Sequence, residues 1–260
     1  MLLRSEKRKA VNRGMFYDEI SEYYDQMIPI EKRIANLKKN LSPILKEYDI
    51  KTALDVGSAT GATCTALAEL GVETVGIELS SKMIKIARDH ASQAGLKIRF
   101  KRADMTENQP GFEKRFDAIL VVANTISHLL DKKSLNKAIA NFKKWLTPGG
   151  ILVIQLLNYH RIFKDRKRIV KIYNNEEKIF IRFYDFGKDL INFNLLTVEN
   201  EPGVCDYELS SVPLRGWKAN EIIDVIKRKG LVSIKKRGNF KGAKFDPANS
   251  NDLILTSRKK

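Results

Sequence analysis

The central part of the chain alternates short apolar runs, rich in β-branched residues, with segments of helical periodicity. The apolar runs predict strands at 52–56, 74–78, 97–101, 116–122 and 151–154. The intervening segments predict helices that end near Leu70, run from Ser80 or Ser81 to about Gln93, and cover 135–146. Strands that alternate with helices in this way are typical of a parallel sheet with crossover helices.

The end of the chain completes this sheet. A helix is predicted at 219–228, and two strands are predicted at 232–236 and 252–256 with a polar loop between them. This pair of strands predicts an antiparallel edge. The sequence therefore predicts the α/β class, with a Rossmann-like seven-stranded sheet that has an antiparallel edge strand.

Residues 158–215 interrupt the alternation and predict an inserted antiparallel β subdomain. Turn residues at Asn174, Asn175 and Gly187 separate segments that resemble strands, and these segments are 168–173, 178–184, 191–197 and 205–209. Two further helices, at 16–25 and 30–45, precede the core. The chain is thus divided into N-terminal helices, a core, an insertion and a core completion, with boundaries at 1–50, 51–157, 158–215 and 216–260.

Charge and composition restrict the function classes. The formal net charge is +16, but the excess is spread along the chain apart from a basic region at 218–260, and no aromatic platform is interleaved with it. A solvated basic surface is therefore favoured over a face that binds nucleic acid. No apolar run approaches the ~20 residues of a membrane helix, and the N-terminus is charged too early for a signal peptide. We expect a soluble, cytoplasmic protein with no membrane partner.

The two cysteines, Cys64 and Cys205, exclude a disulfide framework and lack the C-x-x-C spacing of many zinc sites. No metal ion is expected.

A glycine turn follows the first predicted strand. Gly57, Ala59 and Gly61 let the backbone pass close to a ligand and direct unpaired N–H groups of the next helix toward it. Asp55, just before the turn, discriminates between ligands. A dinucleotide pyrophosphate would be repelled by this carboxylate, whereas a sulfonium cofactor with an ammonium group would be attracted.

Two more carboxylates end the next two predicted strands. Glu78 can accept hydrogen bonds from both ribose hydroxyls, the role of the acidic residue in dinucleotide folds. Asp104 can accept a hydrogen bond from an adenine amino group while Met105 packs on the ring. Ligands bind at the carboxyl ends of strands in open α/β sheets, where all these residues are expected.

These motifs together resemble the class I S-adenosylmethionine-dependent methyltransferases. The resemblance spans roughly residues 16–258, with Ala59 standing where glycine is usual, and rests on 55–61, 77–83, Asp104, 116–120 and 146–150. Segments 16–25, 124–129 and 157–161 are most similar to enzymes of the glycine/sarcosine N-methyltransferase type. The resemblance implies S-adenosylmethionine as cofactor and a small-molecule methyl acceptor.

The resemblance also implies a set of site residues. The N-terminal helix would cover the cofactor, which is expected to contact Tyr24, Asp55, Gly57, Ala59, Gly61, Glu78, Leu79, Asp104, Met105 and Asn124. Tyr17 is expected to pack in that helix.

The expected reaction is in-line displacement of a methyl group from the sulfonium by a nitrogen or oxygen nucleophile, driven by alignment and exclusion of water. His128 or Tyr159 could remove a proton from the acceptor. The alternative for His128 is a purely structural role. Asn158 and Arg161 are the expected substrate-binding residues. Arg161 could bind a substrate carboxylate. Alternatively, it has no role in binding and is only one of the first residues of the insertion.

Three other functions remain open at this stage. An RNA or protein methyltransferase is favoured by the charge, but residues 123–126 read Ala-Asn-Thr-Ile in place of an Asp/Asn-Pro-Pro-aromatic segment. The second alternative is a nicotinamide dehydrogenase, against which Asp55 argues. The third is a cofactor-binding module without turnover. The insertion is predicted to be an acceptor lid, with Tyr159, Arg161, Phe183, Tyr184 and Tyr207 as its groups. The alternative role for it is a sheet that forms a homodimer.

Overall fold

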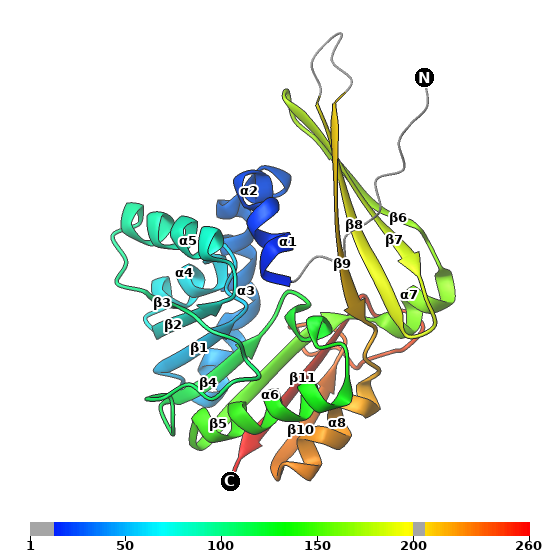
Figure 1. Ribbon diagram of the computed structural model, residues 1–260. Coiled ribbons are helices and arrows are strands. Elements are labelled where there is room, and N and C mark those ends of the chain that lie inside the picture. The colour runs from blue at the N-terminus through cyan, green and yellow to red at the C-terminus, as the bar shows by residue number, and fades with distance from the viewer. Residues whose placement is uncertain (1–12, 200–205) are drawn as a thin grey trace.

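The computed structural model describes residues 13–199 and 206–260, and its core is one seven-stranded sheet (Figure 1). The strand order is β10-β11-β5-β4-β1-β2-β3. The strands are β1 (Thr52–Val56), β2 (Glu73–Glu78), β3 (Arg99–Arg102), β4 (Phe116–Val121), β5 (Leu146–Leu157), β10 (Leu231–Arg237) and β11 (Asp252–Lys259). Strands β1 to β5 are parallel, β11 is antiparallel to β5, and β10 is antiparallel to β11. The predicted fold class, including the antiparallel edge, is confirmed.

Helices cover both faces of this sheet, because alternate strand residues point to opposite sides. Leu54 and Ile119 pack against α6 (Lys132–Trp145) and α8 (Ala219–Arg228) on one face. Ala53 and Leu120 pack on the other face with α3 (Ile30–Tyr48) and α4 (Ala62–Glu69). Helix α5 (Ser81–Gln93) lies beside α4 and completes that layer. Among the helices in the described part of the chain, none is long and apolar enough to cross a membrane.

Strand β5 begins earlier than predicted. Leu146 already pairs with Phe116, and the register then shifts so that Ile151 pairs with Ala118. The Thr-Pro-Gly-Gly segment between them forms an irregularity within the strand, with Gly149 at a φ of 80°, rather than a separate turn before it.

The insertion forms a second, four-stranded sheet, as predicted. Its order is β6-β7-β8-β9 with every pair antiparallel, and its strands are β6 (Ile169–Asn174), β7 (Lys178–Phe186), β8 (Leu190–Glu199) and β9 (Tyr207–Arg215). The fourth strand is longer than the predicted 205–209, and Cys205 lies outside the described residues. A short helix that the sequence did not predict, α7 (Tyr159–Asp165), precedes the sheet. The Asn158 side chain stabilises this helix by accepting a hydrogen bond at its N-terminus.

The helix predicted at 16–25 is broken into three short pieces, α1 (Arg13–Glu19), η1 (Ser21–Tyr23) and α2 (Tyr24–Met27), which we call the cap. Figure 1 shows the cap between α5 of the core and the insertion. Its apolar side chains pack against both neighbours in a single cluster that contains Phe16, Ile20, Tyr23, Met27, Met83, Phe180, Leu195 and Val212. The cap thus joins the core and the insertion through one apolar cluster.

Candidate active site

A cavity of about 540 Å³ lies at the carboxyl ends of β1, β2 and β4. Core, cap and insertion all contribute to its wall. Six of the predicted cofactor residues line it, namely Tyr24, Gly57, Ala59, Glu78, Leu79 and Met105, and so does the predicted catalytic residue His128. Its size lies within the range of small-molecule sites, about 300–1,000 Å³.

The glycine turn has the tight geometry that its sequence predicts. Gly57 has a φ of +74°, and the N–H groups of Gly57 and Ser58 both donate to the carbonyl of Ile77, at 2.8 and 3.0 Å. A Cβ on Gly57 would lie 2.5 Å from Cγ2 of Thr125. Gly61 also has a positive φ, but its neighbours are Ala87 and Phe100. Gly61 thus serves helix packing behind the turn rather than the cavity wall.

Glu78 fastens the turn to the tip of β2. Its Oε2 accepts from the N–H of Ala59 at 3.0 Å, and its Oε1 accepts from the N–H groups of Leu79 at 2.7 Å and Ser80 at 3.0 Å. Burial raises the pKa of this carboxyl, and the three backbone donors oppose that rise. Since a carboxylate has about four acceptor positions, Glu78 retains capacity for a ligand hydroxyl at the cavity.

The other predicted cofactor residues lie just behind the wall. Asp104 accepts from the N–H and the hydroxyl of Thr106, at 2.7 and 2.8 Å, which shapes the turn that presents Met105. Asn124 donates to the Tyr159 hydroxyl at 2.8 Å and accepts from the N–H of Leu157 at 3.2 Å. Both side chains therefore support the cavity wall.

Asp55 is buried beneath the glycine turn and does not reach the cavity surface. The Cys64 thiol donates to its Oδ2 at 3.5 Å. Burial raises the pKa of Asp55 to about 7, and the charge of Glu78 adds to that rise while the thiol opposes it. The carboxyl thus has no direct access to a ligand ammonium group in this conformation.

Asp55 is expected to make the stability of the ligand-free protein depend on pH. The unfolded chain gives up this proton near the ordinary pKa of 3.8, whereas the folded protein keeps it until about 7. The folded state therefore binds more protons between these values, and the free energy of unfolding should fall as pH rises from about 4 to 7 and then level off. Urea unfolding across this range should show a flatter profile for Asp55→Asn. Parallel profiles would mean that Asp55 is ionised in the fold.

Two residues of the cavity wall form a hydrogen-bonded pair. The Tyr17 hydroxyl lies 2.9 Å from Nε2 of His128, with the two rings 5.5 Å apart. Burial raises the pKa of Tyr17 well above its ordinary value, so the phenol stays neutral. The sequence predicted only a packing role for Tyr17, and the helical spacing that it shares with Tyr24 was the available signal.

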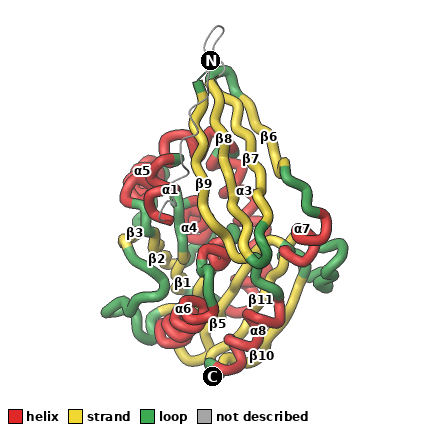
Figure 2. Tube along the Cα trace, turned by 45° about the vertical axis from the view of Figure 1, so that its right-hand side comes forward, coloured by secondary structure: helices red, strands yellow, loops and turns green. Residues whose placement is uncertain are grey.

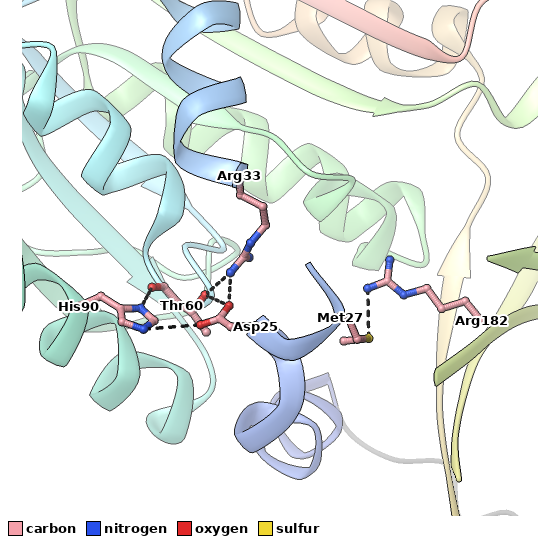
Figure 3. A network of polar contacts seen from close by, with 6 residues as sticks. All are labelled: Asp25, Met27, Arg33, Thr60, His90 and Arg182. Atoms are coloured by element: carbon pink, nitrogen blue, oxygen red, sulfur yellow. Dashed lines mark hydrogen bonds and ion pairs between the residues drawn. The ribbon is translucent and has the colours of Figure 1, made fainter. Parts of the chain in front are cut away.

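Arg33 is a cavity residue that sequence reasoning missed. Its guanidinium pairs with Asp25 of the cap and donates to the Thr60 hydroxyl at 3.0 Å, and that hydroxyl donates to Asp25 at 2.9 Å. His90 joins this network through the Thr60 carbonyl at 3.0 Å and through Asp25 at 3.6 Å (Figure 3). The network connects the cap, α3, α5 and the glycine turn. The Nε of Arg33 is buried without a hydrogen-bond partner in the described structure.

Arg182 of β7 brings a second guanidinium to the cavity. It lies over the ring of Tyr173, with its central carbon 5.0 Å from the ring centroid, and donates to the sulfur of Met27 at 3.3 Å (Figure 3). Both contacts are weaker than an ion pair. No acidic side chain pairs with Arg182 among residues 13–199 and 206–260, so its charge is available to an anionic ligand group.

Tyr159, Asn158 and Arg161, expected to act on the substrate, lie outside the cavity wall. Tyr159 is buried and its hydroxyl accepts from Asn124. The Asn158 amide donates to the carbonyls of residues 247 and 250, and Arg161 donates to that of residue 249 at 3.1 Å. Asn158 and Arg161 thus hold the start of α7 against this loop, whereas Tyr159 points to Asn124.

The chain has recognisable relatives. Residues 53–150 match the family described as a methyltransferase domain. A glycine/sarcosine N-methyltransferase of Aphanothece halophytica is 26% identical over 144 residues, which are 55% of this chain and 54% of that protein. The chain thus spans about half the length of the curated relatives that it matches.

Solved structures resemble the whole fold. An S-adenosylmethionine-dependent methyltransferase from Clostridium acetobutylicum has a TM-score of 0.79 at 17% identity, and the match covers 94% of this chain and 98% of that one. CalS10, an amino pentose methyltransferase of Micromonospora echinaspora solved with S-adenosylmethionine bound, has a TM-score of 0.70 at 15% identity, with 98% and 100% covered.

Fold, cavity and relatives together define the class of protein: residues 53–150 are a methyltransferase domain. More particularly, the chain is similar to glycine/sarcosine N-methyltransferases in sequence and to S-adenosylmethionine-dependent methyltransferases in fold.

Proposed function

We propose that this protein transfers a methyl group from S-adenosylmethionine to a nitrogen or oxygen atom of a small molecule. One observation carries the proposal. A single cavity is lined on one side by the glycine turn and Glu78, and on the other by Tyr17, His128 and Arg182. A cofactor held by the first group would present its reactive end to the second.

The cavity residues fit the proposed cofactor. Glu78 offers its spare acceptor position to a ribose hydroxyl, and Gly57 brings its backbone to the cavity wall. Met105 offers an apolar surface to the adenine. Arg33 lines the same cavity, and its positive charge suits the cofactor carboxylate. The ribose, the adenine ring and the carboxylate of the cofactor thus each have a suitable counterpart among these residues.

The chain's own residues would align the reactants and manage one proton. When bound, S-adenosylmethionine supplies an electrophilic methyl group on its sulfonium sulfur. Tyr17 and Tyr24 of the cap would exclude water from this end of the cavity. The Tyr17 oxygen can accept a hydrogen bond from the acceptor while its own hydrogen points to Nε2 of His128, so that an acceptor proton can pass to the imidazole.

The acceptor is expected to be small, because one cavity of about 540 Å³ would hold both reactants. Arg182 suits an acceptor that carries an anionic group. The names of the relatives, a glycine/sarcosine and an amino pentose methyltransferase, favour an amine. An RNA or protein acceptor is the alternative, and the net charge of +16 is its support.

Binding and transfer can be tested separately. Thermal-shift measurements should show stabilisation by S-adenosylmethionine and by its demethylated product, but not by NAD. Transfer from methyl-labelled cofactor should then be screened over amines, amino acids, phenols, quinones and tRNA. Stabilisation by NAD alone would refute the proposed cofactor. Label transferred only to tRNA would refute the small-molecule acceptor.

The hydrogen-bonded pair gives a prediction for catalysis. Tyr17→Phe keeps the ring but removes the hydroxyl, and His128→Gln removes the proton acceptor. Each is expected to lower kcat by about 100-fold, the lower end for proton transfer by a positioned side chain, with cofactor affinity within a few-fold of wild type. Tyr23→Phe is the matched control, since its hydroxyl bonds to Glu208 outside the cavity. Wild-type kcat in both variants would show that the acceptor needs no proton acceptor.

A further inference from the structure

The insertion's sheet has two faces of different character. Register pairing places Phe180, Leu195 and Val212 on the inner face, where they pack in the cap cluster. Residues of the opposite parity point away from the cap and the cavity. Figure 2 shows this sheet from outside, and no described helix lies in front of it.

An apolar row crosses the outer face. Ile172 of β6 pairs with Ile181 of β7, Ile181 with Leu196 of β8, and Leu196 with Leu209 of β9. The next row toward the hairpin tips contains Asn174, Ile179, Val198 and Tyr207, and the row on the other side begins with Ile169 and Phe183. No charged residue stands in these three rows.

This sheet carries most of the large hydrophobic side chains that are exposed in the described part of the chain. Ile172 is 55% exposed, Tyr207 57% and Leu209 40%. Six of the seven large hydrophobic side chains that are exposed within residues 13–199 and 206–260 belong to this sheet, and the seventh is Met15 of α1. Contiguous apolar patches of this kind mark interaction sites on proteins.

We propose that the outer face binds a second copy of this chain, sheet against sheet, to form a dimer. The row is self-complementary. A two-fold axis parallel to the strands, between β7 and β8, would place Ile172 of one copy over Leu209 of the other and Ile181 over Leu196. Face-to-face packing of antiparallel sheets buries such rows efficiently.

The available area supports a second copy as the occupant. The four strands contain 6, 9, 10 and 9 residues, and at ~3.4 Å per residue and ~4.8 Å between strands they give a flat face of ~550 Å². Side-chain relief enlarges the accessible area toward the about 800 Å² per partner that stable complexes bury. The neutral rows also let two copies, each with a net charge of +16, meet at a point of low repulsion.

Dimerisation has a consequence for the cavity. Arg182 lies on the inner face of β7, between the outward-facing Ile181 and Phe183. A second copy on the outer face would hold this strand in place. The sheet would then serve as both acceptor wall and dimer contact, one role on each face.

Analytical ultracentrifugation over a dilution series tests this directly and does not depend on the proposed methyl transfer. The wild-type protein should dimerise. Ile172→Asp and Leu209→Asp should each raise the dimer dissociation constant at least about thirty-fold, because each buries a charge among apolar groups. Met15→Asp is the matched control, since it makes the same change at the exposed hydrophobic outside the sheet, and it should leave the constant unchanged.

Salt provides a second readout. Because the interface is apolar and the copies repel, raising the NaCl concentration should strengthen the dimer. Thermal unfolding and cofactor affinity, measured on each variant, verify that the fold persists. A wild-type protein that is monomeric at every concentration would overturn the proposal. So would a dimer that both sheet variants retain, or one that salt dissociates.

Discussion

Gly57→Ala should abolish cofactor binding and destabilise the fold. The new Cβ would lie 2.5 Å from Cγ2 and 2.8 Å from Oγ1 of Thr125, and the residue would remain at a φ of +74°. The left-handed backbone costs about 1–2 kcal/mol and the overlap about 1–3 kcal/mol more. We expect the free energy of unfolding to fall by about 2–5 kcal/mol, measured by urea unfolding, with no cofactor binding detected by calorimetry.

Two further variants separate the two costs. Gly71 has a φ of +82° with nothing within 4 Å of the position of a Cβ, so Gly71→Ala should cost only the backbone part and leave binding intact. In a Thr125→Ala background the two closest atoms are gone and Cβ of residue 125, 3.3 Å away, is the nearest, so Gly57→Ala should then cost little more than Gly71→Ala. If Gly57→Ala lowers the free energy of unfolding equally in the wild-type and the Thr125→Ala backgrounds, the turn must rearrange to accommodate the new methyl group.

Glu78→Gln should weaken the binding of S-adenosylmethionine by about 10- to 150-fold, which corresponds to about 1.5–3 kcal/mol for hydrogen bonds to a charged group. The amide keeps the shape of the side chain, but its NH₂ group cannot accept from the N–H of Ala59 or from those of Leu79 and Ser80. The turn would loosen and the ribose acceptor would be lost. The free energy of unfolding should change less than the free energy of cofactor binding, because burial already disfavours the charged form of Glu78.

Glu73→Gln is the matched control for this prediction. Glu73 begins the same strand at its opposite end and its side chain is 62% exposed. Calorimetry should give wild-type affinity for this variant. Unchanged affinity in Glu78→Gln would place the cofactor ribose elsewhere.

Local sequence patterns were sufficient to predict the parallel core. Each crossover unit buries its own apolar runs, and the residues at the strand ends are fixed by the strand itself. Gly57, Glu78 and Met105 could therefore be assigned to the cavity from their positions after successive strands. The antiparallel edge and the antiparallel insertion were predicted on the same basis.

The far side of the cavity was decided by tertiary structure. Tyr17, Arg33 and Arg182 come from three segments outside the core, and they meet only because the cap packs between α5 and the insertion. For Arg182, a shift in strand register by one residue would turn its side chain to the other face.

Packing between separate segments also explains why three residues lie away from the site that was predicted for them. Asn158, Tyr159 and Arg161 follow β5 in sequence, where acceptor residues were expected, but an unpredicted helix begins there. It directs Asn158 and Arg161 to the 247–250 loop and Tyr159 to Asn124. The sequence by itself determined the core, the glycine turn and the side of the cavity that carries Gly57 and Glu78, because each depends on neighbours close in the chain. Only the tertiary structure decided which distant side chains complete the opposite side, because that depends on how separate segments pack.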